Sequence, residues 1–340
     1  MKSIKELYRI GTGPSSSHTM GPRKAAEMFV TRHPDAAKFK VTLYGSLAAT
    51  GKCHMTDVAI IDTLEPTAPV EIIWQPKVFL PFHPNGMTFA AFDTDDKLIE
   101  NWTVYSIGGG ALAENSDTPS IESRDVYGMN SMTEILEWCE RSGKGYWEYV
   151  KECEDSDIWD YLNEVWKTMI DSIRRGLEEE GVLPGPLNLR RKASTYYIRA
   201  TGYKQSLQSR GLVFAYALAV SEENASGGKI VTAPTCGSCG VMPAVLYHLY
   251  KSRDFSDIRI LRALATAGLV GNIVKFNASI SGAEVGCQGE VGVACAMASA
   301  AANQLFGGSP AQIEYAAEMG LEHHLGMTCD PVCGLVQIPC

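Results

Sequence analysis

The stretch VGVACAMASAAANQ, residues 291–304, decides how the second half of the chain folds. Alanine, glycine and serine dominate it, so a helix formed here has little side-chain volume and can pack closely against its neighbours. Such a helix suits the centre of a helical domain. The sequence therefore predicts a buried central helix with other helices around it.

On both sides of this stretch the pattern is helical, and clusters of Gly, Pro and Ser separate the segments. The pattern begins at about residue 131. We predict helices over residues 132–141, 158–180, 207–223, 241–250, 258–276, 289–306 and 310–325. The second half is thus predicted to be all-α.

The first half has a different pattern, in which short β-rich runs alternate with helical segments. The predicted strands cover residues 40–44, 70–74, 78–82, 87–92 and 103–107, and the predicted helices cover residues 22–32 and 47–62. We therefore expect an α+β protein of two domains. Its segments are an α/β domain (1–130), a helical connection (131–170) and an all-α domain (171–340).

Composition limits the possible partners. The chain has 340 residues, 45% of them hydrophobic, which is enough for two cores. A formal net charge of −9 without a basic cluster argues against nucleic acid and favours a small-molecule partner. The start, MKSIKELYRI, lacks the apolar core of a signal peptide, and no apolar run approaches the roughly 20 residues that cross a membrane. We expect a soluble cytoplasmic protein.

Ten cysteines are present, and seven of them lie between residues 236 and 340. The cytosol keeps thiols reduced, so metal binding or catalysis is favoured over disulfides. Cys287, Cys329 and Cys340 lie among Gly-, Ala- and Asp-rich turns, and three thiolate ligands leave a metal centre with one open position. Such a centre can act on substrate as a Lewis acid. These cysteines are predicted metal ligands, with iron–sulfur and zinc chemistry both open.

A loop rich in hydroxyl groups, GTGPSSSHTMGP, covers residues 11–22 and leads into a predicted helix. In it, His18 is surrounded by Ser15, Ser16, Ser17 and Thr19. Backbone N–H groups at a helix start can bind a carboxylate or a phosphate. A plain N-cap is the alternative, although three serines beside a histidine exceed what one cap needs. The loop is therefore a candidate substrate-binding site.

A second motif, GKCHMTD at residues 51–57, places His54 and Asp57 three residues apart. They share one face if the segment is helical, and the carboxylate would then fix the imidazole tautomer. A purely structural His–Asp pair is the alternative. The motif HPNGM, residues 83–87, is interpreted as a turn between two strands.

The motif ENASGGKIVTAPTCGSCG, residues 223–240, leaves two interpretations open. Lys229 could form a Schiff base with pyridoxal phosphate, which would make the chain an eliminase of another class. Cys236 and Cys239 form a CxxC pair that could instead hold a structural zinc ion in a non-enzymatic amino-acid-binding regulator. Neither pattern is specific by itself.

Seven motifs together resemble the bacterial iron–sulfur-dependent L-serine dehydratases of the single-chain type. In chain order they are GTGPSSSHTMGPRKA, GSLAATGKCHMTD, HPNGM, YSIGGG, LPGPLN, EENASGGKIVTAPT and GAEVGCQGEVGVACAMA. The resemblance runs from residue 10 to residue 340. It implies a β-subunit-like domain similar to the allosteric substrate-binding domain of phosphoglycerate dehydrogenase, followed by a helical α-subunit-like domain. It also implies deamination of L-serine to pyruvate and ammonia.

The same resemblance implies the site residues. The family's three cluster ligands match Cys287, Cys329 and Cys340, which implies a 4Fe-4S cluster with one open iron. Its histidine motifs match His18 and His54, and we take His54 as the general base. We expect an active site between the two domains. The residues expected to bind L-serine there are Ser15, Ser16, Ser17, Thr19 and Asp57.

Two features depart from the family pattern. Cys53 stands inside the second histidine motif, where a small residue is expected. The family's helical domain continues beyond the cysteine that matches Cys340, so we expect that the chain is cut short there. Besides L-serine, the expected partner is a second copy of the chain, as in a homodimer, with no nucleic acid and no membrane.

Overall fold

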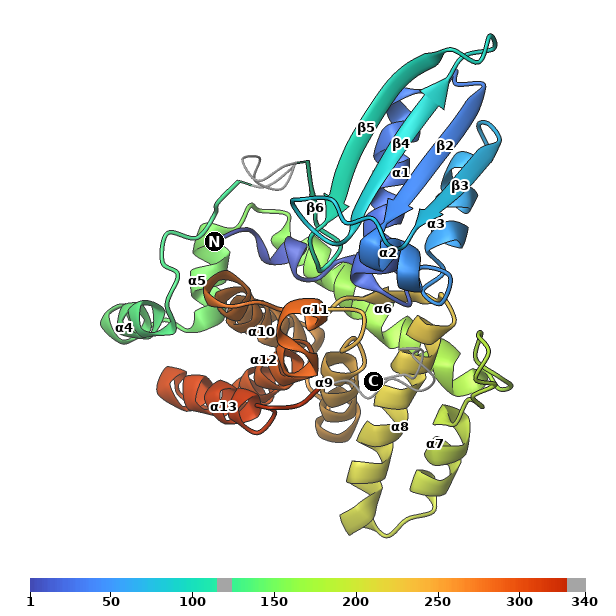
Figure 1. Cartoon of the computed structure of the whole chain (residues 1–340). Helices are drawn as coiled ribbons and strands as arrows, with labels where there is room; N and C mark the ends of the chain where they lie inside the picture. The colour runs from blue at the N-terminus through green and yellow to red at the C-terminus, as the bar shows by residue number, and fades with distance from the viewer. Residues whose placement is uncertain (115–123, 329–340) are drawn as a thin grey trace. The chain divides into compact units, whose positions relative to one another are not determined.

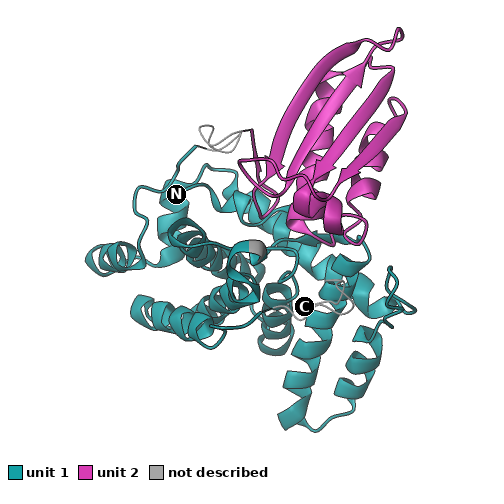
Figure 2. Ribbon diagram, in the orientation of Figure 1, with its two compact units in different colours: residues 1–11, 124–330, 338–340 teal, residues 12–123, 331–337 magenta. Residues whose placement is uncertain are grey.

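A computed structural model describes residues 1–114 and 124–328. The chain forms two compact units, coloured separately in Figure 2. One contains the described part of Thr12–Ser123, and the other contains Met1–Gly11 and the described part of Arg124–Asp330. The domain boundaries predicted from the sequence differ from this division, because residues 1–11 and the predicted connection pack with the later helices.

The α/β unit is built on a five-stranded mixed sheet (Figure 1) with the order β3-β2-β4-β5-β6. Its strands are β2 (Lys38–Tyr44), β3 (Val70–Gln75), β4 (Gly86–Phe92), β5 (Leu98–Ser106) and β6 (Leu112–Ala113). β2 pairs with β3 in parallel and with β4 in antiparallel orientation. Alternate residues of β2 are buried, as expected of a strand with one face on a core.

Helices α1 (Gly21–Arg32) and α3 (Thr56–Leu64) supply the other side of this core. Phe29 of α1 packs against Phe39 and Phe89 of the sheet, with ring centroids 6.0 Å and 5.4 Å away. Ile60 of α3 belongs to the same buried cluster. The strands and helices of the first half therefore pack together in one core.

The helix predicted over residues 47–62 is wrong, because two helices occupy this stretch. α2 (Gly45–Thr50) and α3 are separated by a turn in which Met55 has a φ of 55°. A left-handed residue ends the regular helical path. At Gly51, an added Cβ would lie 2.2 Å from the carbonyl oxygen of Leu47, so the turn is tight. His54 consequently lies in a turn and not on a helix face.

The strand predicted over residues 78–82 is also wrong. The segment between β3 and β4 is irregular, and Val78 and Phe79 are 43% and 64% exposed. Pro76, Pro81 and Pro84 interrupt it, and a proline has no N–H to donate to a sheet. The apolar residues alone suggested a strand that the prolines prevent.

The helical unit follows the predicted segments closely and adds three helices that were not predicted, α5, α7 and α11 (Figure 1). The central helix, α12 (Val291–Leu305), is largely buried and packs against α9, α10 and α13. The other helices are α4 (Met132–Ser142), α5 (Tyr146–Cys153), α6 (Ile158–Glu178), α7 (Ala193–Thr201), α8 (Gln205–Ala225), α9 (Val241–Arg253), α10 (Asp257–Asn277), α11 (Gly282–Val285) and α13 (Pro310–Glu322).

This half of the chain is not all-α, contrary to the prediction. A short strand, β7 (Lys229–Val231), pairs with β1 (Ile10–Thr12) from the start of the chain. The partner is more than two hundred residues away in the sequence, so no local pattern indicates the pairing. Among the described helices, none has both the length and the apolar composition needed to cross a membrane.

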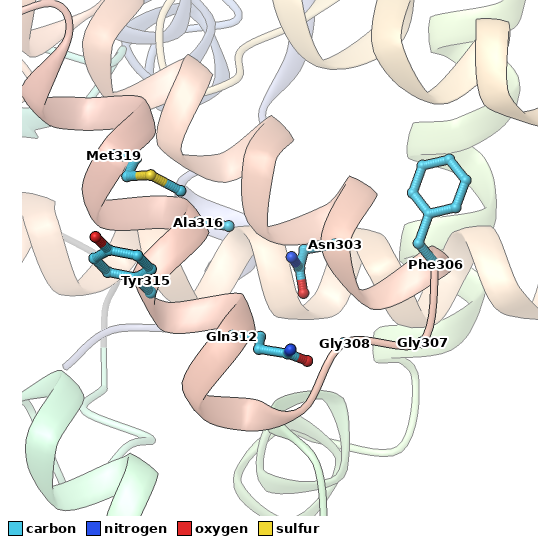
Figure 3. Close-up of a pocket in the computed structure, with 8 residues that line it drawn as sticks. All are labelled: Asn303, Phe306, Gly307, Gly308, Gln312, Tyr315, Ala316 and Met319. Atoms are coloured by element: carbon cyan, nitrogen blue, oxygen red, sulfur yellow. The ribbon is translucent and has the colours of Figure 1, made fainter.

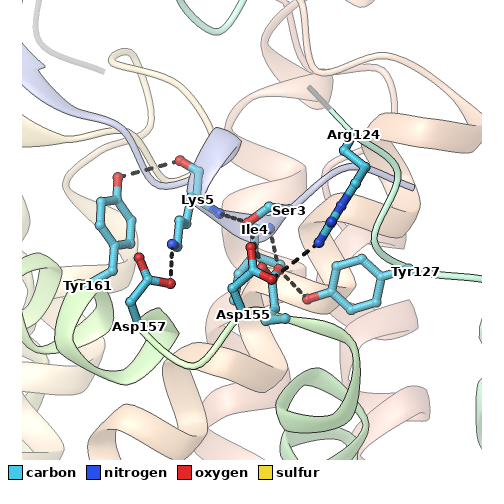
Figure 4. A network of polar contacts seen from close by, with 9 residues as sticks. Ser3, Ile4, Lys5, Arg124, Tyr127, Asp155, Asp157 and Tyr161 are labelled. Carbon is cyan, nitrogen blue, oxygen red and sulfur yellow. Dashed lines mark hydrogen bonds and ion pairs between the residues drawn. The ribbon is translucent and has the colours of Figure 1, made fainter. Parts of the chain in front are cut away.

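The N-terminal segment is tied to the loop between α5 and α6 (Figure 4). The carboxylate of Glu154 accepts hydrogen bonds from the Ser3 hydroxyl at 2.6 Å, the Ile4 N–H at 2.8 Å and the Tyr127 hydroxyl at 2.7 Å. The Lys5 ammonium also donates to a carboxylate of this loop, that of Asp157, at 2.6 Å. These bonds fix the residues before β1 onto the helical unit.

The close contact between α6 and α8 depends on Gly176. A Cβ at this position would lie 2.2 Å from the carbonyl oxygen of Ala219 and 2.6 Å from its carbonyl carbon. Backbone atoms cannot rotate aside, so we expect Gly176→Ala to lower the free energy of unfolding by roughly 1–3 kcal/mol. Chemical denaturation measures this change. Gly128→Ala is the control, because an added Cβ there meets nothing within 4 Å; equal stability of the two variants would contradict the prediction.

Candidate active site

Loops of the α/β unit bring His18 and His54 together. Their ring centroids are 4.8 Å apart. His18 lies in the short helix η2 (Ser16–Met20), and His54 lies in the turn between α2 and α3. The Thr19 hydroxyl donates to the carbonyl of His54 at 2.6 Å, and the Thr56 hydroxyl donates to the carbonyl of His18. These two bonds hold the two motifs against each other.

The tautomer of His54 is set by the backbone. Its Nδ1 lies 3.1 Å from the carbonyl oxygen of Thr50. A carbonyl only accepts, so Nδ1 carries the proton and Nε2 carries the lone pair. Burial lowers the pKa of His54, and the hydrogen bond to Thr50 opposes this only in part. His54 is therefore neutral at pH 7 and presents a basic Nε2.

Asp57 does not make the contact that was expected to orient this ring. It lies in the first turn of α3, whereas the Nδ1 proton of His54 points to the Thr50 carbonyl. The orienting group is thus a backbone atom four residues before the histidine. A carbonyl leaves no mark in the side-chain sequence, which is why sequence reasoning selected the carboxylate instead.

His18 is buried more deeply, with 8% of its surface exposed. Its Nδ1 lies 2.9 Å from the Ser17 hydroxyl, and its Nε2 lies 3.1 Å from the Ser46 hydroxyl. Burial first, and then the charge of His54, lower the pKa of His18 to about 3. Because hydroxyl groups engage both ring nitrogens, His18 is the poorer base of the two and suits a positioning role.

The hydroxyl-rich loop is partly a cap for η2. The Ser15 hydroxyl accepts the N–H of His18 at 3.1 Å, and the Ser15 N–H donates to the Thr19 hydroxyl at 3.1 Å. Ser16 is buried, with 7% of its surface exposed. The capping alternative is thus realised at Ser15, and the same bonds fix the loop that carries His18.

Sequence reasoning missed two residues of this site. Ser46 supplies a hydroxyl to Nε2 of His18, and His83 lies near enough for its charge to lower the pKa of His18 further. The Nδ1 of His83 accepts the N–H of Asn85 at 3.1 Å, which orients its ring. His83 lies in the motif HPNGM, but the sequence of this motif is equally well explained by a turn between two strands, so the histidine was not selected.

The buried state of His18 predicts that acid destabilises the fold. Its pKa is lowered to about 3 from 6.5, so between these values only the unfolded chain takes up the proton. This contribution to stability is present above pH 6.5 and is lost as the pH falls, by about 2 kcal/mol at pH 5. Thermal unfolding at pH 7 and pH 5 measures it. In His18→Gln the loss of stability between pH 7 and pH 5 should be smaller by this amount. An unchanged loss of stability would refute the assignment.

Cys287 lies in a loop of the helical unit just before α12. It begins the short helix η3 (Cys287–Gly289) and is 6% exposed. The N–H of Gln288 donates to the carbonyl of Met327 at 3.2 Å, and the Gln288 side chain accepts the N–H of Gly326 at 2.7 Å. The segment that leads to Cys329 therefore lies against the Cys287 loop. Cys329 and Cys340 themselves lie outside the described residues.

Glu290 carries a partly buried carboxyl group beside this loop that the sequence did not single out. A Cβ added to Gly282 would lie 2.6 Å from one of its oxygens, and a Cβ on Gly237 would lie 3.2 Å from the other. Burial raises the pKa of Glu290, and the Thr235 hydroxyl opposes the rise. The glycines of two motifs therefore make room for one carboxyl group.

The residues of the two alternative interpretations lie nearby. Lys229 is exposed on β7. Cys236 and Cys239 are buried, and burial raises the pKa of Cys236, which disfavours the thiolate that zinc binds. In the part of the chain that the structure describes, no group of three or more His, Cys, Asp or Glu side chains is arranged to hold a metal ion.

The acidic pair that precedes Lys229 has a structural role. The Glu222 carboxylate accepts the N–H groups of Lys192 at 2.6 Å and Ala193 at 3.3 Å, at the start of α7. The neighbouring Glu223 forms a 3.2 Å ion pair with Arg191. A negative charge at a helix N-terminus is favourable. This motif therefore holds α7 onto α8.

A cavity of about 320 Å³ opens at the turn between α12 and α13 (Figure 3). It lies at the C-terminal end of α12, whereas Cys287 precedes the N-terminal end. A helix of 15 residues separates the two ends by about 22 Å. The cavity is therefore not part of the cysteine loop. Its lining residues are Asn303, Phe306, Gly307, Gly308, Gln312, Tyr315, Ala316 and Met319.

Comparison with known proteins places these motifs in a family. Residues 61–340 match the family described as the serine dehydratase alpha chain, and residues 3–75 match the serine dehydratase beta chain. The L-serine dehydratase TdcG of Escherichia coli is 40% identical, over 100% of this chain and 86% of its own length. The L-serine dehydratases of Haemophilus influenzae and Streptomyces coelicolor are each 39% identical, over 100% and 99% of this chain and 86% of their own lengths. The chain belongs to the serine dehydratase family, with beta-chain and alpha-chain regions in one polypeptide.

Proposed function

We propose that this chain is an L-serine ammonia-lyase, which converts L-serine to pyruvate and ammonia. The observation that carries the proposal is the sequence identity of 40% to an L-serine dehydratase over the full length of the chain. The neutral imidazole of His54, with its Nδ1 proton held by Thr50, agrees with the base that such a reaction needs.

In the proposed reaction, Nε2 of His54 takes the proton from Cα of L-serine. The electron pair of that C–H bond forms the Cα–Cβ double bond, and the Cβ–O bond breaks with loss of hydroxide. The resulting aminoacrylate tautomerises and is hydrolysed to pyruvate and ammonia. A positioned base contributes roughly 10²- to 10⁴-fold to such a rate. Hydroxide is a poor leaving group, so a second catalytic element is required.

A 4Fe-4S cluster is the proposed cofactor, held by Cys287, Cys329 and Cys340. The contacts of the Cys287 loop support this set, because Gln288 is hydrogen-bonded to Gly326 and Met327, which shortly precede Cys329 in the chain. Thiolates are the usual ligands of these clusters. When bound, the cluster would supply a Lewis acid that stabilises the departing hydroxide.

Several residues are proposed to hold the substrate. The hydroxyl and N–H groups of the η2 loop offer neutral donors, and Asp57 offers a partner for the ammonium group. We further propose that the α/β unit resembles the allosteric domain of phosphoglycerate dehydrogenase and that the chain forms a homodimer. A cytoplasmic location is also proposed, since the cytosol keeps thiols reduced. The proposed substrate-binding residues are Ser15, Ser16, Ser17, Thr19 and Asp57.

The proposal is tested by purifying the chain without oxygen, measuring iron and sulfide, and assaying pyruvate formed from L-serine. We expect about four irons and four sulfides per chain, as a 4Fe-4S cluster requires, and pyruvate with ammonia in equal amounts. Full activity after iron removal, with borohydride trapping of an adduct on Lys229, would favour pyridoxal phosphate instead. Zinc without iron, and serine binding without turnover, would favour a regulator.

A further inference from the structure

Helices α7 and α8 lie side by side and share an exposed apolar stripe (Figure 1). The rings of Tyr196 on α7 and Phe214 on α8 are 5.2 Å apart. Tyr203 stands seven residues after Tyr196, and Leu207 stands seven residues before Phe214. Residues at this spacing lie on one side of a helix. Leu207 and Phe214 are 55% and 53% exposed. An exposed apolar stripe that spans two helices marks an interaction surface.

The stripe carries positive charge. Arg199 follows Tyr196 by three positions, and Arg210 follows Leu207 at the same distance, so each guanidinium neighbours an apolar side chain of the stripe. Both arginines are exposed, and among the described residues neither forms an ion pair with a carboxylate. Six of the chain's 30 Lys and Arg residues lie between residues 181 and 221, but none of its 39 Asp and Glu residues does. The complement of this face is therefore acidic.

The helix α13 of the same unit presents the opposite charge with the same spacing. Glu318 follows Tyr315 by three positions, and Glu322 follows Met319 at the same distance. No Lys or Arg occurs in the sequence after residue 275. Burial first, and then the charge of Glu318, raise the pKa of Glu314. Carboxylates that share a surface without a cation raise one another's pKa in this way. The acidic complement of the hairpin is thus present on the chain itself.

The cavity at the turn between α12 and α13 lies on this acidic face (Figure 3). Tyr315 and Met319 line it together with Phe306, and Phe306 and Tyr315 are each 59% exposed. Its volume of about 320 Å³ is at the lower end of the range for binding pockets, which suits one apolar side chain. On the hairpin, Phe214 is the most exposed aromatic residue of the stripe.

We propose that the α7–α8 face of one chain packs against the α12–α13 face of a second copy, with Phe214 in the cavity. This contact forms the homodimer of the proposed function. Each copy offers both faces, so two identical contacts are related by one twofold axis. Side chains of this size have about 150–250 Å² of surface, so the exposed parts of the seven apolar residues amount to roughly 500–800 Å² per copy. A standard interface buries about 800 Å² per partner.

The test reverses the charge of each face and measures mass by light scattering during size-exclusion chromatography. Wild type should have twice the 36.9 kDa mass of one chain. One variant combines Arg199→Glu with Arg210→Glu, and the other combines Glu318→Lys with Glu322→Lys. Either variant brings like charges together at both contacts, so its dimer dissociation constant should rise by at least about a hundredfold. An equimolar mixture of the two restores opposite charges and should form a heterodimer.

The matched control combines Lys77→Glu with Lys97→Glu, which reverses two exposed charges of the α/β unit, and should remain a dimer. Phe214→Ala alters an exposed side chain, so it should fold as wild type does but dimerise more weakly. A monomeric wild type, reversed variants that stay dimeric, or a mixture without heterodimer would overturn the proposal. A monomeric wild type that binds phosphatidylserine vesicles would assign the hairpin to an anionic membrane instead. Pyruvate formation is assayed separately, so an inactive dimer contradicts the proposed activity alone.

Discussion

Replacement of Cys287 by alanine should remove most of the iron and lower L-serine deamination by roughly 10³-fold or more, since Lewis-acid catalysis by a metal is worth several kcal/mol. Cys287 is one of three proposed ligands, and its side chain is buried beside the start of α12. The loop that carries it is bonded to the segment before Cys329. Loss of one thiolate would therefore affect the proposed site that both segments form.

Iron and sulfide analysis together with a pyruvate assay measures this effect. Cys295→Ala is the matched control, because Cys295 lies in the first half of α12, eight residues after Cys287, and is only partly buried. It should keep the iron and the activity of wild type. Cys236→Ala and Cys239→Ala should also keep the iron. Full iron content and full activity in Cys287→Ala would disprove the assignment of Cys287 as a ligand.

Replacement of His54 by glutamine should lower kcat for L-serine by roughly 10²- to 10⁴-fold, or about 3–5 kcal/mol. Glutamine retains a side-chain N–H that can reach the Thr50 carbonyl, so the turn between α2 and α3 is preserved. The basic Nε2 is lost, which removes the proposed proton acceptor. The KM for L-serine should change little, because the substrate is bound by other groups.

The pH profile of wild type distinguishes a base from a structural histidine. The pKa of His54 is lowered by burial, so the neutral, active form persists below the ordinary value of 6.5. The acid limb of kcat/KM should therefore lie below pH 6.5, and His54→Gln should lack it. His33→Gln is the control, since His33 lies in the same unit and bonds to Glu100 instead. Wild-type kcat in His54→Gln would eliminate His54 as the base.

Much of the helical unit could be predicted from the sequence, because local patterns specify those helices. Ser131 and Glu134 form a capping box that starts α4, and Ser309 with Gln312 does the same for α13. The small residues of α12 also indicated its central position. Such signals depend only on neighbours in the chain.

Predictions failed where distant segments decide the conformation. β7 has β1 as its pairing partner, which is distant in the sequence. The left-handed turn at Met55 lies next to His54, where the ring of His54 approaches that of His18. Glu290 fits only because Gly237 and Gly282, from two separate loops, leave room for its carboxyl group. None of these contacts has a periodicity that a local reading can detect.

The sequence by itself determined the family of this protein, because the motifs that contain His18, His54 and Cys287 occur in order along the chain. It also supplied the residue types of the proposed chemistry. Only the tertiary structure supplies a physical reason for preferring His54 to His18 as the proposed base. The Thr50 carbonyl accepts a hydrogen bond from Nδ1 of His54, which leaves Nε2 basic, while the hydroxyls of Ser17 and Ser46 lie at the two ring nitrogens of His18. These roles depend on burial and on hydrogen bonds from backbone and distant side chains, which exist only after the chain has folded.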